Sequence, residues 1–111
     1  MSHHRTPYQS FGEFIQLNRK RMRLSQTALS VLLDVDRAHL SRIECGIKQL
    51  ATDKLVPLAD VFKLKLAEVQ REFYADLIVS EILRNNCPES VLETARAKVK
   101  YLKAIHKEPV I

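Results

Sequence analysis

Residues 24–46 contain two short helical patterns of hydrophobic and polar positions, joined by a tight turn. The apolar positions of the first pattern share one face at helical spacing and are Leu29, Leu32 and Leu33. Ser25 precedes this pattern and suits an N-cap, because its hydroxyl can accept a hydrogen bond from a backbone N–H of the first turn. The polar sequence of residues 34–36 then interrupts the pattern. These features predict one helix that buries an aliphatic face.

A second helix is predicted from Arg37 to about Cys45, with Asp36 as its N-cap and Gly46 as a left-handed residue that ends it. Three positions on one side of this helix are expected to face inward: Leu40, Ile43 and Glu44. The positions on the other side are expected to face solvent: Arg37, Ala38, Ser41 and Arg42. A compact helix pair whose second member exposes arginine and small polar side chains fits the major groove of DNA.

The rest of the chain also follows helical patterns, which predicts an all-α fold. Ser10 and Glu13 form a capping-box sequence at the start of a helix that runs to about Met22. The apolar residues available to the core from this helix are Phe14, Ile15, Leu17 and Met22. Another helix begins at residue 52 or 53, and Pro57 favours a late or kinked start for it. A further helix begins near Ala67.

The last predicted helix follows Pro88 and carries apolar residues at alternating steps of three and four. These residues are Leu92, Ala95, Val99 and Leu102. The spacing is that of a coiled-coil seam of about two heptads, which is too short to hold a coiled coil alone. Two interpretations remain open: the seam packs on its own domain, or it forms a dimer contact. We expect the dimer contact.

Charge is distributed unevenly along the chain. The 111 residues include 18 Lys and Arg against 13 Asp and Glu, a net charge of +5. Residues 1–48 hold eight of these basic and four of these acidic residues, so most of the excess accompanies the helix pair. A basic surface beside such a pair favours phosphate binding.

Several other function classes are disfavoured by the composition. Cys45 and Cys87 lie far apart without clustered ligands, so we expect free thiols in a reducing compartment and no metal site. No catalytic constellation or phosphate-binding glycine loop is evident, so we expect neither an enzyme nor a cofactor. The chain shows neither a signal peptide nor a membrane span, which predicts a cytoplasmic, nucleoid-associated protein. Residues 1–9 are predicted to form a flexible arm.

The helix pair resembles the helix-turn-helix of the phage-repressor (Cro/C1-type, or XRE) family. The matching residues are the sequence Leu24-Ser25-Gln26, Leu29, Val35 and the sequence Leu40-Ser41-Arg42-Ile43-Glu44-Cys45-Gly46. The looser resemblance extends from about Phe11 to Val69. It departs from the family at Ser30, Asp34 and Cys45, where the family usually has alanine, glycine and a basic residue or asparagine. Asp34 still tolerates a left-handed turn.

The resemblance implies a five-helix DNA-binding domain over residues 10–72 and a C-terminal helical extension over residues 73–111. It also implies a structural ion pair between Arg19 and Glu44. The expected base-reading residues are Arg37, Ala38, Ser41 and Arg42, of which the arginines suit guanine and the alanine suits a thymine methyl group. The expected phosphate-binding residues are Gln26, Thr27, His39, Lys48, Gln49, Arg21 and Arg23.

A single recognition helix covers few base pairs, so we expect a homodimer on an inverted repeat of double-stranded DNA. An alternative of a different class remains open. In it, the chain is an antitoxin-like interaction module whose C-terminal helices hold a second protein, and DNA binding is autoregulatory.

Overall fold

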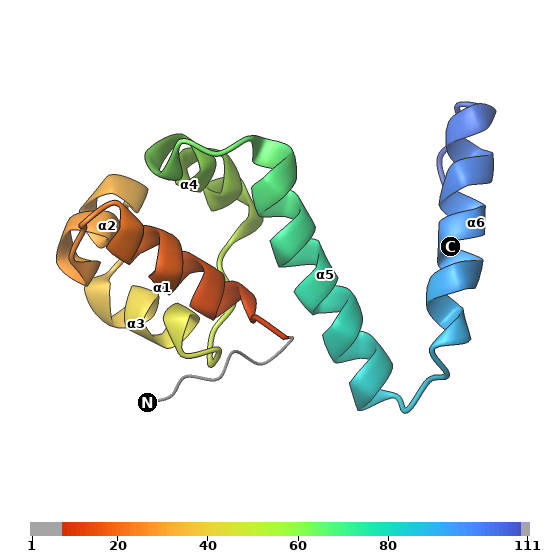
Figure 1. The fold of residues 1–111 in the computed structure, drawn as a ribbon, viewed down its shortest axis with the longest axis horizontal. Helices are drawn as coiled ribbons and strands as arrows, with labels where there is room; N and C mark the ends of the chain where they lie inside the picture. The colour runs from red at the N-terminus through yellow and green to blue at the C-terminus, as the bar shows by residue number, and fades with distance from the viewer. Residues whose placement is uncertain (1–7, 110–111) are drawn as a thin grey trace. The chain divides into compact units, whose positions relative to one another are not determined.

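The structure, a computed structural model, describes residues 8–109. Every regular element in this range is helical (Figure 1). The elements in chain order are α1 (Phe11–Arg21), α2 (Gln26–Leu33), α3 (Arg37–Glu44), the 3₁₀ helix η1 (Thr52–Lys54), α4 (Leu55–Phe62), α5 (Leu66–Arg84) and α6 (Ser90–Ala104). The predicted all-α class is confirmed. The chain divides into two compact units, residues 1–77 and residues 78–111. The predicted boundary after residue 72 falls within α5.

Serine caps fix where the first two helices begin. The Ser10 hydroxyl accepts a hydrogen bond from the Glu13 N–H at 3.1 Å, and the Glu13 carboxylate accepts one from the Ser10 N–H at 2.9 Å. Ser25 caps α2 by accepting from the Ala28 N–H at 3.0 Å. Both predicted caps are confirmed. The predicted side-chain cap of α3 is wrong: Asp36 occupies the N-cap position of the backbone, but its carboxylate makes no capping hydrogen bond.

Left-handed residues follow four of the helices in the first unit, the first being Arg23, which has φ 58° just beyond α1. Asp34 has φ 56° after α2, and Lys63 has φ 57° after α4. Gly46 has φ 82° just beyond α3, as predicted. The 3₁₀ turn η1 precedes α4, whose first turn contains Pro57. This arrangement confirms the late helix start that a proline favours, since a first-turn N–H has no intrahelical partner to lose.

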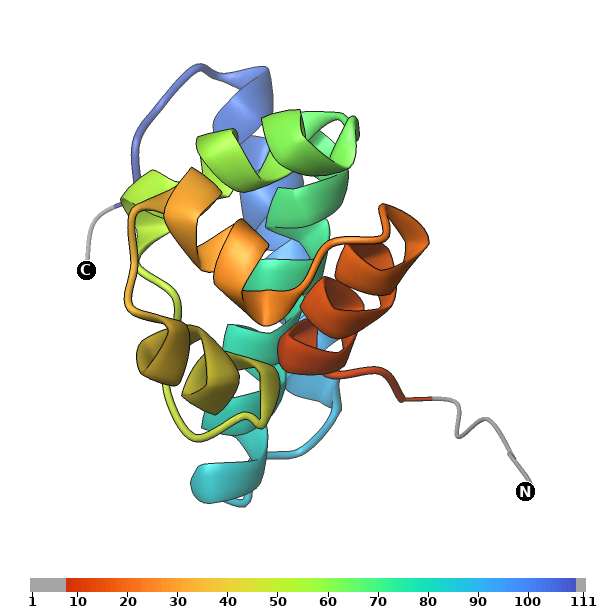
Figure 2. The ribbon, with the colours of Figure 1, turned by 90° about the vertical axis from the view of Figure 1, so that its left-hand side faces the viewer.

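One core serves the first unit. Figure 2 shows the ribbon of the helices that contribute to it. Its most completely buried side chains come from α1 to α5 and from the segment before η1, and they are Ile15, Leu29, Leu33, Leu40, Leu50, Leu58, Phe62, Val69 and Phe73. Two predicted core residues are exposed instead: Leu17 retains 58% of its accessible surface and Leu32 retains 54%. Each lies on the solvent side of a short helix whose inward face is already filled by its neighbours.

The start of α5 completes this core and holds the N-terminal segment. Phe73 meets Phe11 edge to face, with ring centroids 5.1 Å apart. One turn further on, the Asp76 carboxylate accepts hydrogen bonds from the Phe11 N–H at 2.6 Å and from the Tyr8 hydroxyl at 2.5 Å. The bond to Asp76 raises the pKa of Tyr8 to about 12, because it stabilises the neutral phenol. Tyr8 and Gln9 are the only residues of the predicted arm that the structure describes.

The second unit has a different character. None of the described residues of α6 is buried, and its apolar residues are exposed or half-buried. Leu92 and Val99 retain 48% and 52% of their accessible surface. An isolated helix of this length is only marginally stable in water, so α6 needs a packing partner.

Gly12 allows α1 to approach the end of α3 closely. A Cβ atom at Gly12 would lie 2.5 Å from the Glu44 carbonyl oxygen and 2.6 Å from that of Ile43. Both obstacles are backbone atoms, so a methyl group here must move one helix relative to the other.

We therefore expect Gly12→Ala to lower the free energy of unfolding by about 1–2 kcal/mol, since overpacking outweighs the gain in helix propensity. Thermal and urea unfolding followed by circular dichroism measure this loss. The control is Lys20→Ala on the exposed side of α1, which should change stability by less than about 0.5 kcal/mol. Equal stability of the two variants would contradict the close approach.

Candidate nucleic-acid interface

Helix α3 has a buried side and an exposed side. Leu40, Ile43 and Glu44 are buried against the domain. On the other side, three of the four predicted base-reading residues are exposed, namely Arg37, Ala38 and Arg42, and Ser41 is half-buried. His39, predicted to contact phosphate, is also half-buried. The helix thus presents two guanidinium groups to solvent from a rigid base.

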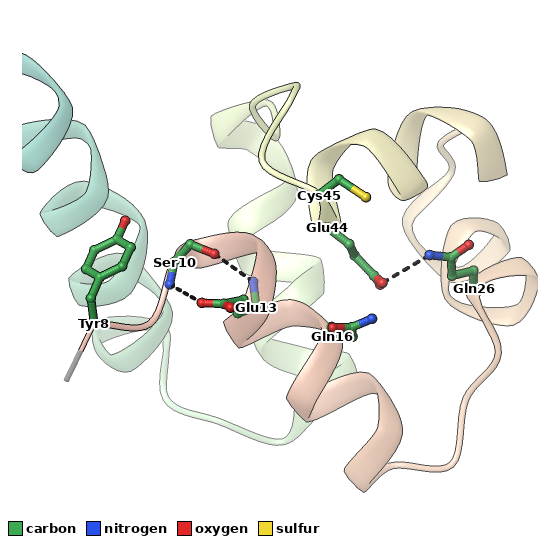
Figure 3. Close-up of a pocket in the computed structure, with 7 residues that line it drawn as sticks. All are labelled: Tyr8, Ser10, Glu13, Gln16, Gln26, Glu44 and Cys45. Atoms are coloured by element: carbon green, nitrogen blue, oxygen red, sulfur yellow. Dashed lines mark hydrogen bonds between the residues drawn. The ribbon is translucent and has the colours of Figure 1, made fainter. Parts of the chain in front are cut away.

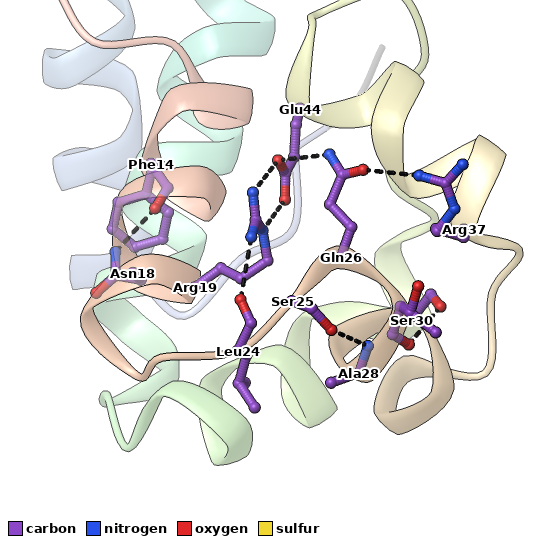
Figure 4. Close-up of polar contacts among 11 residues, drawn as sticks. Phe14, Asn18, Arg19, Leu24, Ser25, Gln26, Ala28, Ser30, Arg37 and Glu44 are labelled. Atoms are coloured by element: carbon purple, nitrogen blue, oxygen red, sulfur yellow. Dashed lines mark hydrogen bonds and ion pairs between the residues drawn. The ribbon is translucent and has the colours of Figure 1, made fainter.

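Behind α3 lies a buried ion pair that joins it to α1 (Figure 4). The Arg19 Nε donates to Glu44 Oε2 at 2.7 Å, and a terminal nitrogen of the same guanidinium donates to Glu44 Oε1 at 3.0 Å. The side chains retain only 10% and 2% of their accessible surface. The other terminal nitrogen donates to the Leu24 carbonyl at 3.0 Å, which ties in the α1–α2 connection. Hydrogen bonding to Glu44 raises the pKa of Arg19, despite the opposing effect of burial.

Gln26 continues this polar network to the exposed face. Its amide nitrogen donates to Glu44 Oε1 at 3.0 Å, and its amide oxygen accepts from Arg37 at 3.3 Å. A chain of polar contacts therefore runs from Arg19 through Glu44 and Gln26 to Arg37 (Figure 4). The sequence predicts Gln26 only as a phosphate-binding residue. Its bridging position depends on the spacing between α2 and α3, which no local pattern reveals.

Five of the seven residues predicted to bind phosphate are exposed, and they fall into two groups. Four are exposed at the edges of the helix pair: Thr27, Arg23, Lys48 and Gln49. The backbone N–H groups of Ile47 and Lys48 both donate to the Arg42 carbonyl, which keeps the start of the loop beside the end of α3. Arg21 differs, because its guanidinium donates to Asn18 Oδ1 at 3.1 Å and to the Phe62 carbonyl at 2.8 Å. It joins α1 to the end of α4.

A shallow groove lies beside the network, at the N-terminal segment and the ends of α1, α2 and α3 (Figure 3). Its lining residues are Tyr8, Ser10, Glu13, Gln16, Gln26, Glu44 and Cys45. Both carboxylates in it already accept hydrogen bonds, that of Glu13 in the capping box and that of Glu44 in the ion pair. Cys45 carries a free, exposed thiol.

The described residues provide neither a metal-binding cluster nor a membrane-spanning helix. Within residues 8–109, no group of three or more His, Cys, Asp or Glu side chains is arranged to hold a metal ion. None of the described helices has both the length and the apolar character needed to cross a membrane.

Comparison with protein-family models matches residues 15–69 to a helix-turn-helix family. The match runs from Ile15 within α1 to Val69 near the start of α5, and it includes the ion pair, the Gln26 bridge and the exposed side of α3. No curated protein and no solved structure matches the chain.

We expect Glu44→Ala to lower the free energy of unfolding by about 3–5 kcal/mol, because it leaves the Arg19 charge buried with only a carbonyl partner. That loss is a large share of the roughly 5–15 kcal/mol that stabilises a domain. Chemical denaturation measures it. The matched control is Glu81→Ala, which removes the exposed 2.6 Å pair with Arg84 and should cost about 0–1 kcal/mol.

Glu44→Gln separates charge from shape. It keeps the side-chain volume and one acceptor oxygen, so its stability should fall between that of the original protein and that of Glu44→Ala. A Glu44→Ala protein as stable as the Glu81→Ala control would show that the pair does not hold α3.

Proposed function

Because this chain belongs, through residues 15–69, to the helix-turn-helix family of Cro/C1-type DNA-binding regulators, we propose that it is a sequence-specific transcriptional regulator that uses α3 as its recognition helix. One observation carries this proposal: α3 exposes Arg37, Ala38 and Arg42 while its opposite side is fixed by the core and by a buried ion pair. A helix held in this way can enter the major groove without reorganising.

Base recognition follows from the chemistry of the exposed side. A guanidinium group can donate two hydrogen bonds to guanine O6 and N7, so Arg37 and Arg42 each suit one guanine. Ala38 suits a thymine methyl group, and the Ser41 hydroxyl suits a base or a phosphate. The Gln26 amide oxygen accepts a hydrogen bond from Arg37 and holds this side chain near the N-terminus of α2. The contact reduces the rotamer freedom that Arg37 loses when it binds DNA.

Phosphate contacts supply most of the affinity. The N-terminus of α2 presents free backbone N–H groups beside Gln26 and Thr27, and Arg23 lies just before it. Lys48 and Gln49 suit the neighbouring stretch of backbone, and His39 lies at the edge of the helix. We omit Arg21 from this surface, since its guanidinium is engaged at the end of α4. Binding should weaken steeply with salt.

We propose that two copies bind one inverted repeat, with their recognition helices one turn of DNA apart, about 34 Å. The dimer contact is assigned to Leu92, Ala95, Val99 and Leu102, which form an apolar seam on α6 with none of its residues buried. The protein works without a cofactor and without enzymatic activity in this role, in the cytoplasm at the nucleoid.

The same exposed seam also favours a second candidate, an antitoxin-like module that holds another protein on its C-terminal helices. Co-purification of a stoichiometric second polypeptide would distinguish that candidate.

We expect Arg37→Ala and Arg42→Ala each to weaken binding to the preferred duplex by about 1–3 kcal/mol and to relax the preference at one base pair. The measurement begins with selection from random duplexes, which should return an inverted repeat. Fluorescence anisotropy then compares each variant on the selected and on scrambled duplexes.

The matched control is Lys48→Ala, assigned to phosphate. It should weaken binding to both duplexes equally and reduce the salt dependence by about one counterion. If the two arginine variants lose the same affinity on scrambled as on selected DNA, α3 does not read sequence.

A further inference from the structure

The charged residues that flank the α6 seam are distributed unevenly along the helix, and this distribution distinguishes a parallel from an antiparallel pair of α6 helices. In heptad terms, the seam consists of Leu92, Ala95, Val99 and Leu102. On one edge, the flanking positions are Glu89, Arg96 and Lys103. On the other edge they are Val91, Lys98 and Ile105. Among these flanking positions, the one acidic residue therefore lies at the N-terminal end of the helix, and the basic residues lie in its centre and at its C-terminal end.

We propose that α6 pairs with α6 of a second copy of this chain in antiparallel orientation. This proposal rests on the proposed function in one respect, the assignment of the dimer contact to α6. The occupant of the seam is thus the identical helix of another subunit. The axis of two-fold symmetry passes close to the middle of the helix, between Ala95 and Val99.

Charge complementarity favours this orientation over the parallel one. In a parallel pair in register, each Lys98 would lie beside the partner's Lys103, which gives two repulsive contacts and no attractive one on α6. In the antiparallel pair, each Glu89 lies beside the partner's Lys103, which gives two attractive contacts. The remaining cations, Arg96 and Lys98, each face their own symmetry copy near the axis, where long side chains can turn toward solvent.

The sizes of the seam residues point to the same orientation. A parallel pair would stack Ala95 on the partner's Ala95 and leave a gap in the seam, because each alanine is flanked by larger side chains. A shallow depression on the surface of α6 lies beside Ala95 on the edge that carries Val91 and Lys98; its other lining residues are Ser90 and Thr94. In the antiparallel pair, Val99 of the partner lies against Ala95, and Leu92 meets the partner's Leu102. The combined side-chain volume then differs less from one layer of the seam to the next than it does in a parallel pair.

The exposed state of α6 explains why a partner is required. Leu92 and Val99 in α6, and Ile105 just after it, retain about half of their accessible surface. Burial of these side chains in a pair offsets the entropy of ordering a helix of this length. Val91 and Ile105 widen the apolar strip on one edge, and in the antiparallel pair they lie opposite each other.

Disulfide trapping of the full chain tests the orientation directly. In a background that carries Cys45→Ser and Cys87→Ser, a single cysteine is introduced at one of three positions. Lys98→Cys lies near the antiparallel axis and should form a cross-linked dimer under mild oxidation. Leu92→Cys should form no cross-linked dimer, because its two copies in the antiparallel pair would lie about 15 Å apart along the helix axes. A disulfide spans at most about 7 Å between Cα atoms. Ala97→Cys, on the solvent side, is the matched control.

The opposite pattern overturns the proposal. A dimer trapped through Leu92→Cys but not through Lys98→Cys would show a parallel pair. Sedimentation of the uncrosslinked protein as a monomer at tens of micromolar would show that α6 packs within its own chain or on another protein. Neither result affects the base-reading role of α3, which the duplex-binding measurements test separately.

Charge reversal provides an independent measurement on the reduced protein. Lys103→Glu and Glu89→Lys should each weaken dimerisation by about threefold to tenfold, since each reversal affects two symmetric pairs. The double variant should restore it. Lys98→Glu should leave dimerisation unchanged, because one like-charge contact replaces another, whereas in a parallel pair it would strengthen dimerisation by pairing with Lys103. Failure of the double variant to recover would contradict the antiparallel pair.

Discussion

The bidentate ion pair between Arg19 and Glu44 fixes the recognition helix on the rest of the domain. Its two hydrogen bonds, together with a third from Arg19 to the Leu24 carbonyl, join α1, the α1–α2 connection and the end of α3 in one contact. A guanidinium group suits this task because its donors are held in one plane and match a carboxylate. The pair is costly to break from one side, so α3 is held in one position even though the helix is only two turns long. Gly12 allows the close approach on which this contact depends.

Arginine serves different purposes in this protein according to where the fold places it. Arg19 is buried and structural, and Arg21 closes the end of α4 by donating to a backbone carbonyl. Arg37 and Arg42 are exposed on the side of α3 that faces away from the core. The basic composition of the N-terminal half therefore overstates the charge available to DNA, since part of it is already neutralised or engaged within the domain.

The two units of the chain bury their apolar residues to very different extents. The first unit fills one core with side chains from five helices and a connecting segment. In the second unit, α6 has a regular apolar pattern but no buried residue. A regular seam without a partner in its own unit is typical of a surface that associates, because the same side chains would otherwise remain in water. The proposed DNA recognition and the proposed association with another chain therefore lie in separate parts of one short sequence.

The sequence by itself determined the helical class, the two serine caps, the left-handed turns at Asp34 and Gly46, and the recognition-helix pattern. These features depend on residues within one or two turns of each other, so local chemistry is sufficient. Only the tertiary structure decided that Leu17 and Leu32 face solvent, that Arg21 holds α4, and that Gln26 bridges Glu44 to Arg37. Each of these outcomes depends on the distance and angle between helices that are separated in sequence. Those quantities are set by how the whole core packs, and no periodicity along the chain records them.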